Sequence, residues 1–281
     1  MKKSLLFISI LSILFLAACG GGETDENNTS DGGEGQTVEI TVGASSTPHA
    51  EILEQAKPLL EEEGIILNVD EYQDYVLPND DLASGELDAN YFQHIPFLQQ
   101  TISDTGYELE SIGGIHIEPM GVYSKGIESI EDIEDGTEVI MSNSVPDHGR
   151  ILSLFESAGL ITLKEGVEKS EATMEDIEEN PMNLEFSPDY AAEFLPELYH
   201  NEENALVVIN TNYAIGADLN PLEDALFIEG KDSEYVNVVA VRSEDADNES
   251  LNKLVEVLRS EEIQNFILEE YEGAVVPVDG E

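Results

Sequence analysis

The order of apolar and polar positions along this chain predicts strands and helices that alternate. Short alternating or continuous apolar runs predict strands at 38–42, 65–69, 109–117, 138–141, 206–209 and 235–241. Apolar positions three and four residues apart predict helices at 48–63, 79–85, 95–104, 146–158, 251–258 and 263–271. Strands that take turns with helices are typical of the α/β class, and we assign the fold to it.

Local signals predict where the first two helices begin and end. Thr47 precedes Pro48, which suits an N-cap followed by a proline in the first turn, and Gly64 follows the last helical position. Asn79 is expected to cap the short helix that ends at Gly85.

The segment 88–97, with the sequence DANYFQHIPF, carries aromatic rings close to an imidazole. If it is extended, Phe92 and His94 share one face, and Pro96 ends the strand just after them. An apolar ring beside an imidazole suits a pocket for a small molecule that has an apolar tail and a polar end. The alternative is a buried phenylalanine and a histidine that caps a helix.

The first residues predict export and a lipid anchor. Lys2 and Lys3 precede an apolar run at 5–16, and small residues lead to Cys19. This arrangement is typical of a secretory signal, which we place at 1–18. The small residues before the cysteine resemble the lipobox of bacterial lipoproteins, which implies that Cys19 becomes the first mature residue and carries lipid. The alternative is an ordinary signal peptide that contains a cysteine.

Residues 19–36 are mostly Gly, Asp, Glu, Asn, Ser and Thr, so they cannot bury enough surface to fold and are expected to form a flexible acidic tether. The mature protein is then held at the cell membrane and faces the exterior. Cys19 is the only cysteine, which excludes an internal disulfide framework and a cysteine-ligated zinc site.

The charge of the chain is strongly negative. Its 281 residues include 11 Lys and Arg against 61 Asp and Glu, a formal net charge of −50. This balance excludes nucleic acid and other anionic surfaces as natural partners. It indicates an acidic, halophilic type of exported protein adapted to a saline or alkaline exterior, in which most acids form a solvated surface.

The strand–helix series behind the tether suggests two lobes with a ligand cleft between them. We expect 37–118 and 236–281 to form lobe I and 119–235 to form lobe II. Ligands of open α/β sheets lie at the carboxyl ends of strands. The candidates that follow predicted strand ends are Ser45, Tyr75, Phe92, Asn143 and Asn210.

Arginine occurs at three positions, 150, 242 and 259. Arg242 ends a strand and Arg259 lies on the polar side of a helix, so both are expected to be surface charges. Arg150 follows a loop that opens a helix, where a planar and always charged guanidinium suits a carboxylate ligand. The alternative is a salt bridge to one of the many acids.

Several specific motifs occur in one order from about residue 38 to the C-terminus. They are DYVLPN at 74–79, DAN at 88–90 with FQH at 92–94, YSK at 123–125, Asn143 with Gly149-Arg150, ENP at 179–181, VINT at 208–211 and YVN at 235–237. In these motifs the chain resembles the methionine-binding lipoproteins of bacterial ABC importers, the NlpA/MetQ family. The resemblance implies a two-lobed, periplasmic-binding-protein-like fold that captures L-methionine and delivers it to the ABC permease.

The resemblance also implies roles for single residues. Arg150 would hold the ligand α-carboxylate, Asn210 and Asn237 would bond its carboxylate or amino group, and Asn143 would line the same loop. Phe92 and Tyr75 would form an apolar slot for the thioether chain. His94 would touch the end of the ligand side chain, and Phe97 would close the wall.

The chain departs from the family pattern in two places. Pro146-Asp147-His148 replaces the usual Thr/Ser-Asn pair and a variable residue before Gly149. Asp147 brings a negative charge near the expected carboxylate site, where it would weaken binding or recognise the ligand ammonium. The stretch 186–203 also differs, and it could alter the cleft wall. D-methionine, a methionine-containing dipeptide and another apolar amino acid therefore stay open as ligands.

Two other classes of function, a secreted hydrolase and a metal-binding protein, are less favoured by the sequence. The chain has no Gly-x-Ser-x-Gly elbow, and its only cysteine is the expected anchor. Its five histidines, 49, 94, 116, 148 and 200, are well separated, and there is no Asp-x-Asp-x-Asp-Gly loop. We expect a binding protein with no catalytic residues, no cofactor and no metal.

Overall fold

The computed structural model describes residues 37–230 and 233–278. The expected signal at 1–18, the lipid site at Cys19 and the tether at 19–36 lie outside these residues. No helix in the described part of the chain is long and apolar enough to cross a membrane.

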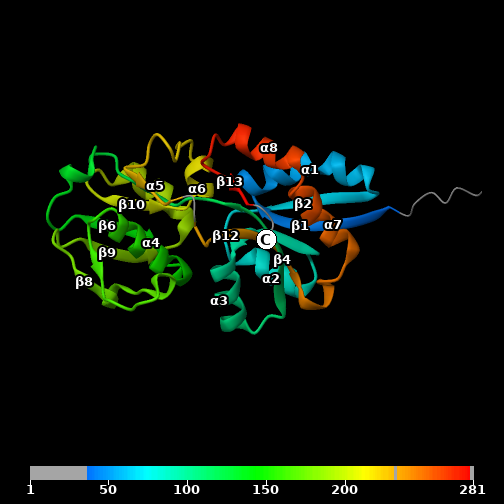
Figure 1. Cartoon of the computed structure of the whole chain (residues 1–281), viewed down its shortest axis with the longest axis horizontal. Coiled ribbons are helices and arrows are strands. Elements are labelled where there is room, and N and C mark those ends of the chain that lie inside the picture. Colours follow the sequence, from blue (N-terminus) through cyan, green and yellow to red (C-terminus); the bar gives the residue numbers. More distant parts are fainter. Residues whose placement is uncertain (1–36, 231–232, 279–281) are drawn as a thin grey trace, which may run out of the picture. The chain divides into compact units, whose positions relative to one another are not determined.

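The first sheet has six strands in the order β13-β4-β12-β3-β1-β2 (Figure 1). Its strands are β1 (Val38–Ser45), β2 (Ile65–Tyr72), β3 (Ala89–His94), β4 (Leu109–Ile117), β12 (Val236–Arg242) and β13 (Val276–Pro277). β1 pairs in parallel with β2 and β3, whereas β12 runs antiparallel between β3 and β4. A strand from near the C-terminus therefore completes the sheet that the N-terminal strands begin.

Helices cover both faces of this sheet. They are α1 (Glu51–Glu62), α7 (Glu249–Leu258) and α8 (Glu261–Glu270) on one face, and α2 (Leu77–Ser84) and α3 (Ile95–Thr105) on the other. β12 shows why both faces are filled. Val239 and Val241 pack into the first cluster, and Val238 and Ala240 into the second. Each buried valine contributes about 1.5–3 kcal/mol relative to exposure.

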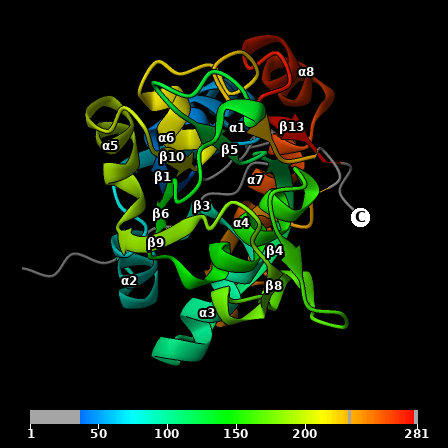
Figure 2. The same cartoon turned by 90° about the vertical axis from the view of Figure 1, so that its left-hand side faces the viewer.

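The second sheet has five strands in the order β11-β5-β10-β6-β9. Its strands are β5 (Gly121–Tyr123), β6 (Glu138–Ser142), β9 (Glu185–Tyr190), β10 (Leu206–Ile209) and β11 (Phe227–Ile228). α4 (Val145–Ser157) covers one face, and α5 (Leu195–Asn201) and α6 (Thr211–Gly216) cover the other, as Figure 2 shows. The α/β class is confirmed, with a separate core for each sheet.

Smaller elements complete the chain. β7 (Thr162–Leu163) and β8 (Ile177–Glu179) form a two-stranded sheet. A π-helical turn occupies Ser46–Ala50, and short 3-10 helices occupy Ile130–Asp132, Lys169–Glu171, Met174–Asp176, Ala192–Phe194 and Ser243–Asp245. The chain leaves the first sheet after β4 and returns to it before β12. These two crossings carry Glu118 and Glu229 to the site described below.

The prediction that Asn79 caps a helix is wrong. α2 begins at Leu77, and the side chain of Asp74 accepts hydrogen bonds from the backbone N–H groups of Val76 and Leu77. Asn79 lies inside the helix, buried, and donates to Gln93 Oε1 at 2.9 Å. An aspartate placed upstream therefore provides the capping that we expected from the asparagine.

Thr47 has the backbone conformation expected of an N-cap, but its side chain does not cap the helix. Its conformation is extended and helical turns follow, but its hydroxyl donates to Glu51 Oε1 at 2.7 Å rather than accepting from a backbone N–H. Thr47 therefore orients the first acidic side chain of α1.

Arg242 and Arg259 are more than surface charges, so that prediction is wrong. Arg242 Nη1 donates to the carbonyls of Leu82 and Leu87, at 3.0 and 2.5 Å. Arg259 Nε donates to Gly114 O at 2.8 Å. Each guanidinium therefore donates to backbone carbonyl groups, one of which, Leu82 O, also accepts from the backbone N–H of Gly85 at 3.2 Å.

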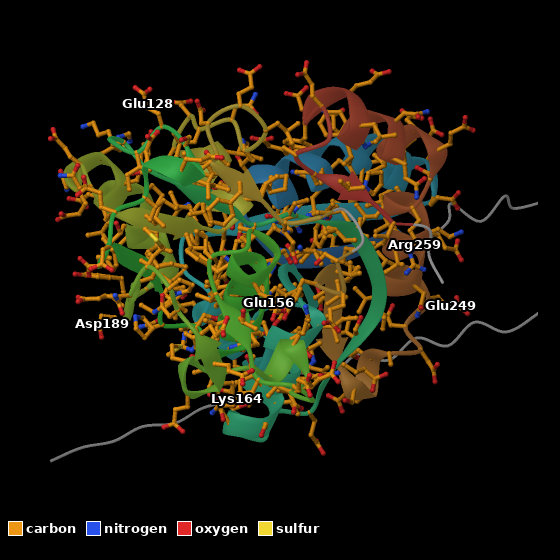
Figure 3. The ribbon with its side chains drawn as sticks, turned by 60° about the vertical axis from the view of Figure 1, so that its left-hand side comes forward. Glu128, Glu156, Lys164, Asp189, Glu249 and Arg259 are labelled. Carbon is orange, nitrogen blue, oxygen red and sulfur yellow. The ribbon has the colours of Figure 1, made fainter. Side chains whose placement is uncertain are left out.

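Many acidic side chains project into solvent, as the sequence indicates. Glu128, Asp189 and Glu249 are exposed and point away from the ribbon in Figure 3. A few acids are buried instead, namely Glu118 and Asp147. Those two belong to the candidate site.

Candidate ligand-binding site

A pocket lies between the two sheets and takes side chains from both. It is lined by Tyr75, Phe92, Gln93, His94, Phe97, Glu118, Asp147, Arg150, Asn210, Thr211, Asn212 and Asn237. Seven of the eight residues that the sequence analysis names for the ligand are among them. Asn143 is not: its side chain is exposed, and its backbone N–H donates to Tyr190 O at 2.8 Å. The structure therefore does not bring Asn143 together with the others.

Aromatic rings form one wall of the pocket. The ring centroid of Tyr75 lies 6.0 Å from that of Phe92 and 5.9 Å from that of Phe97. Phe92 sits at a bulge, because the register of β3 against β12 passes from Gln93 directly to Tyr91. Such a bulge re-aims a side chain, and here it accompanies the placement of Phe92 in the wall. The Tyr75 hydroxyl donates to Asn212 Oδ1 at 2.6 Å, which fixes the ring.

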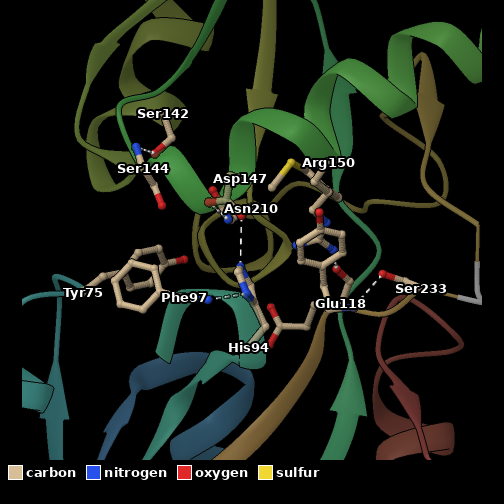
Figure 4. A network of polar contacts seen from close by, with 12 residues as sticks. Tyr75, His94, Phe97, Glu118, Ser142, Ser144, Asp147, Arg150, Asn210 and Ser233 are labelled. Carbon is tan, nitrogen blue, oxygen red and sulfur yellow. Dashed lines mark hydrogen bonds and ion pairs between the residues drawn. The ribbon is translucent and has the colours of Figure 1, made fainter. Parts of the chain in front are cut away.

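His94 both caps a helix and lines the pocket. Its Nδ1 accepts from the backbone N–H of Phe97 at 3.2 Å, at the start of α3. The proton is therefore on Nε2, which lies 3.0 Å from Asp147 Oδ1 (Figure 4). The two interpretations of this histidine hold at the same time.

Asp147 comes from the first turn of α4 and is buried. Its Oδ2 accepts from Asn210 Nδ2 at 3.4 Å. Burial alone would raise the pKa of Asp147, but hydrogen bonding to His94, the charge of Arg150 and the amide of Asn210 together hold it below its usual value. A carboxylate thus faces the pocket from the position where the resemblance predicts none.

Arg150 lies on the same helix and is held from several sides. Its Nε and Nη2 donate to Glu229 Oε2 at 2.9 and 2.5 Å, and Nη2 also donates to Glu118 O at 2.6 Å. The guanidinium carbon lies 4.6 Å from the ring centroid of Tyr235. Burial would lower the pKa of Arg150, but Glu229 and Asp147 raise it overall, so the charge is secure. Arg150 therefore both forms a salt bridge with Glu229 and lines the pocket.

Sequence reasoning missed three side chains at the base of this site. His116 and Glu118 follow one another with a spacing of two at the end of β4, and His49 stands at the start of the α1 region. Glu118 Oε1 lies 2.8 Å from His116 Nε2 and 3.2 Å from His49 Nε2. The signal that could have found them is the spacing of His116 and Glu118, which places both on one strand face.

The environment of these three groups is dry. Burial lowers the pKa of His49 to about 4, against the opposing charge of Glu118, so the imidazole is neutral. Burial would raise the pKa of Glu118, but the two imidazoles and Arg150 hold it below its usual value. Among the described residues, His49, His116 and Glu118 are the one group whose ligand atoms, all within 4.8 Å of one another, could hold a metal ion.

The arrangement suits a small molecule with an apolar chain and a zwitterionic head. The aromatic wall stands opposite Arg150 and Glu118, with His94 between them (Figure 4). A family model described as NlpA lipoprotein matches residues 40–279. The chain belongs to the NlpA lipoprotein family.

Individual members of the NlpA lipoprotein family agree with this assignment. The methionine-binding lipoprotein MetQ of Bacillus subtilis (strain 168) is 45% identical over 283 residues, covering 99% of each chain. The D-methionine-binding lipoprotein MetQ of Salmonella typhi is 37% identical over 269 residues, covering 95% of this chain and 94% of its own length. A nutrient binding protein from Burkholderia cenocepacia, solved bound to methionine, has a TM-score of 0.80 and 38% identity, covering 85% of this chain and 100% of its own. The two-lobed fold is that of this family.

Proposed function

We propose that this chain is the lipid-anchored substrate-binding protein of a bacterial ABC importer and that it captures L-methionine. The observation that carries the proposal is one pocket in which three aromatic rings face Arg150, in a chain of the NlpA lipoprotein family. The names of the relatives support methionine as the ligand, and none of them describes an enzyme. The chain is therefore inferred to bind and deliver its ligand unchanged.

Each half of methionine has a complement in the pocket. Tyr75, Phe92 and Phe97 provide the surface for the thioether chain, and sulfur–aromatic contacts contribute about 0.3–1.5 kcal/mol each. Arg150 and Asn237 provide donors for the α-carboxylate. The amide orientation of Asn237 supports this role, because its Oδ1 lies 3.1 Å from His49 Nε2 and its Nδ2 is left for the pocket.

Delivery requires that the protein be held near its permease. Cleavage before Cys19, lipid on that residue and the tether at 19–36 would keep the binding domain at the outer face of the membrane. We infer lobes of 37–118 with 236–281, and of 119–235, because the chain crosses between the two sheets near residues 118 and 235. Closure of these lobes on the ligand would present one docking surface to the permease subunits.

The stereochemistry of the ligand is open to a second candidate. One relative is named for methionine and another for D-methionine. A pocket of this kind also discriminates by only about 1–3 kcal/mol for one methylene. Asp147 and the 186–203 stretch are the places where specificity could differ.

A thermal-shift panel tests the proposal. The mature domain, unfolded and refolded to remove any bound ligand, is heated with each of the twenty amino acids and with D-methionine. L-methionine at about one hundred times its Kd should add about 2.7 kcal/mol of stability and raise the melting temperature. A panel in which another amino acid stabilises the protein and methionine does not would refute the ligand assignment.

A further inference from the structure

Three buried amide side chains form a network between α2 and β3. Asn79 comes from the first turn of α2, and Asn90 and Gln93 come from β3. Their exposed fractions are 2%, 0% and 3%. Gln93 reaches the edge of the ligand pocket, whereas Asn79 and Asn90 do not line it. The network is therefore centred outside the pocket, within lobe I.

The hydrogen bonds of this network are complete. Asn79 Nδ2 donates to Gln93 Oε1 at 2.9 Å, and Gln93 Nε2 donates back to Asn79 Oδ1 at 2.8 Å. Asn90 Nδ2 donates to Asn79 Oδ1 at 2.8 Å and to Pro78 O at 3.0 Å, and Asn90 Oδ1 accepts from Gln93 Nε2 at 2.8 Å. Each amide oxygen and nitrogen of the three side chains thus has a partner. A buried polar network that is fully satisfied holds its elements rigidly.

The bulge in β3 makes the network possible. In a regular strand, Asn90 and Gln93 would point to opposite faces of the sheet. The register of β3 against β12 passes from Gln93 to Tyr91, which leaves Phe92 as an extra residue. Ala89 and Tyr91 pack into the first cluster, whereas Asn90 and Gln93 both bond to α2. The same bulge therefore turns Gln93 toward α2 and leaves Phe92 for the aromatic wall.

The α2 side of the network fixes the other part of that wall. Tyr75 stands four residues before Asn79. The network bonds both the Asn79 side chain and the Pro78 carbonyl to β3, so the segment that leads from Tyr75 into α2 is anchored to the strand that carries Phe92. The ring centroids of Tyr75 and Phe92 lie 6.0 Å apart. One network thus holds both rings from behind.

We propose that Asn79 and Asn90 are positioning residues that set the spacing of Tyr75 and Phe92, and through it the length of the side chain that the protein accepts. The inference rests on the proposed function, which makes the ligand an amino acid with a thioether chain. Neither asparagine touches the ligand. Their effect is to keep the rings from moving apart when a longer side chain enters. The alternative is a network that secures α2 and affects stability alone.

Calorimetric titration with two ligands separates these roles. One ligand is L-methionine, and the other is L-ethionine, which has one more methylene in its side chain. The wild-type chain should prefer L-methionine by about tenfold or more. Asn79→Ala should reduce that preference at least about threefold, because a loosened wall admits the extra methylene.

Asn248→Ala is the matched control, because it also removes an asparagine that is bonded at a helix of lobe I. The Asn248 side chain accepts from the backbone N–H groups of Ser250 and Leu251 at the start of α7. Its loss should lower stability, measured by denaturant unfolding, and leave the preference between the two ligands unchanged. A preference that falls equally in Asn248→Ala and Asn79→Ala would overturn the positioning role.

A double-mutant cycle tests whether the network acts through the wall. Phe92→Leu changes the preference by itself, and adding Asn79→Ala to it should then change the preference little, since the ring that the network positions is absent. A full additional effect of Asn79→Ala in the Phe92→Leu chain would contradict the proposal.

Asn79→Ser is the second variant, because it keeps a polar group but is too short to keep the paired amide contacts with Gln93. It should reduce the preference in the same direction as Asn79→Ala. An unchanged preference in the variants, a wild-type chain that binds both ligands equally, or the failure of both variants to fold would refute this inference alone. A wild-type chain that binds neither ligand would refute the proposed function as well.

Discussion

Glu229 already occupies one edge of Arg150, since its Oε2 lies 2.9 Å from Nε and 2.5 Å from Nη2. A ligand carboxylate must therefore either use the remaining Nη1 edge or displace Glu229. The same contact keeps the guanidinium fixed before any ligand arrives, together with the ring of Tyr235. Such pre-organisation lowers the entropy that binding would otherwise cost.

Removing the guanidinium should affect binding and stability separately. Arg150→Ala is expected to weaken L-methionine binding at least about tenfold, because a hydrogen bond to a charged group contributes about 1.5–3 kcal/mol. It should also lower the free energy of unfolding by about 1–3 kcal/mol, because Glu229 is left partly buried without its partner. Calorimetry and denaturant unfolding measure the two effects.

Two further variants separate these effects. Adding Glu229→Gln to Arg150→Ala should restore part of the stability but none of the affinity. Arg259→Ala removes a guanidinium outside the pocket and should leave the affinity for L-methionine unchanged. If Arg150→Ala bound L-methionine with wild-type affinity, Arg150 would not be a ligand-binding residue.

Stability should fall as the pH drops from 6.5 toward 4, in part because of His49. Burial lowers the pKa of His49 from 6.5 to about 4 in the folded state. The unfolded chain therefore binds a proton in this range that the folded chain does not, so stability rises with pH there. The full effect is about 3 kcal/mol. The groups that face this imidazole are Glu118, His116 and Tyr91.

His49→Gln should flatten this part of the stability curve, measured by denaturant unfolding between pH 6.5 and pH about 4.5. His200→Gln is the matched control, because it removes an exposed histidine outside the buried cluster around His49. A slope that is the same in His49→Gln as in the wild type would show that this histidine is not buried in its neutral form.

The melting temperature should increase from low salt to molar NaCl. The 61 acids against 11 basic residues repel one another, and added salt screens that repulsion within about 10 Å at about 0.1 M. Choline chloride should give a similar increase if screening is the cause. An increase with NaCl alone would indicate specific cation binding, and a flat curve in both salts would contradict the prediction.

Strong periodicity made much of the fold predictable. The alternation at 235–241 and the spacing at 146–158 correspond to β12 and α4, each within a residue or two. The short strands were missed for physical reasons. β5 has three residues, too few to show a period, and β9 carries Pro188 and four acidic or hydroxyl side chains at the edge of its sheet.

Part of the site was predictable from single segments, and the family resemblance added Tyr75, Phe97, Asn210 and Asn237, which also line the pocket. Phe92 and His94 stand out because they are close in sequence, and Arg150 because arginine is rare. His116 and Glu118 lie two residues apart at the end of β4, but His49 comes from a distant segment that only the tertiary fold brings to them, and the same holds for Glu229 opposite Arg150. Asn143 shows the opposite error, since a position after a strand end does not determine where its side chain points.

Mass spectrometry of the small molecule that co-purifies with the mature chain tests the central claim most directly. The protein is purified without added amino acids and then denatured. Mass spectrometry identifies the released ligand, and chiral chromatography determines whether it is the L or the D enantiomer. The account predicts L-methionine, in an amount comparable to the protein, and its loss from Arg150→Ala prepared in parallel. Release of a different apolar amino acid, with methionine absent, would contradict the assigned ligand while leaving membership of the NlpA lipoprotein family intact.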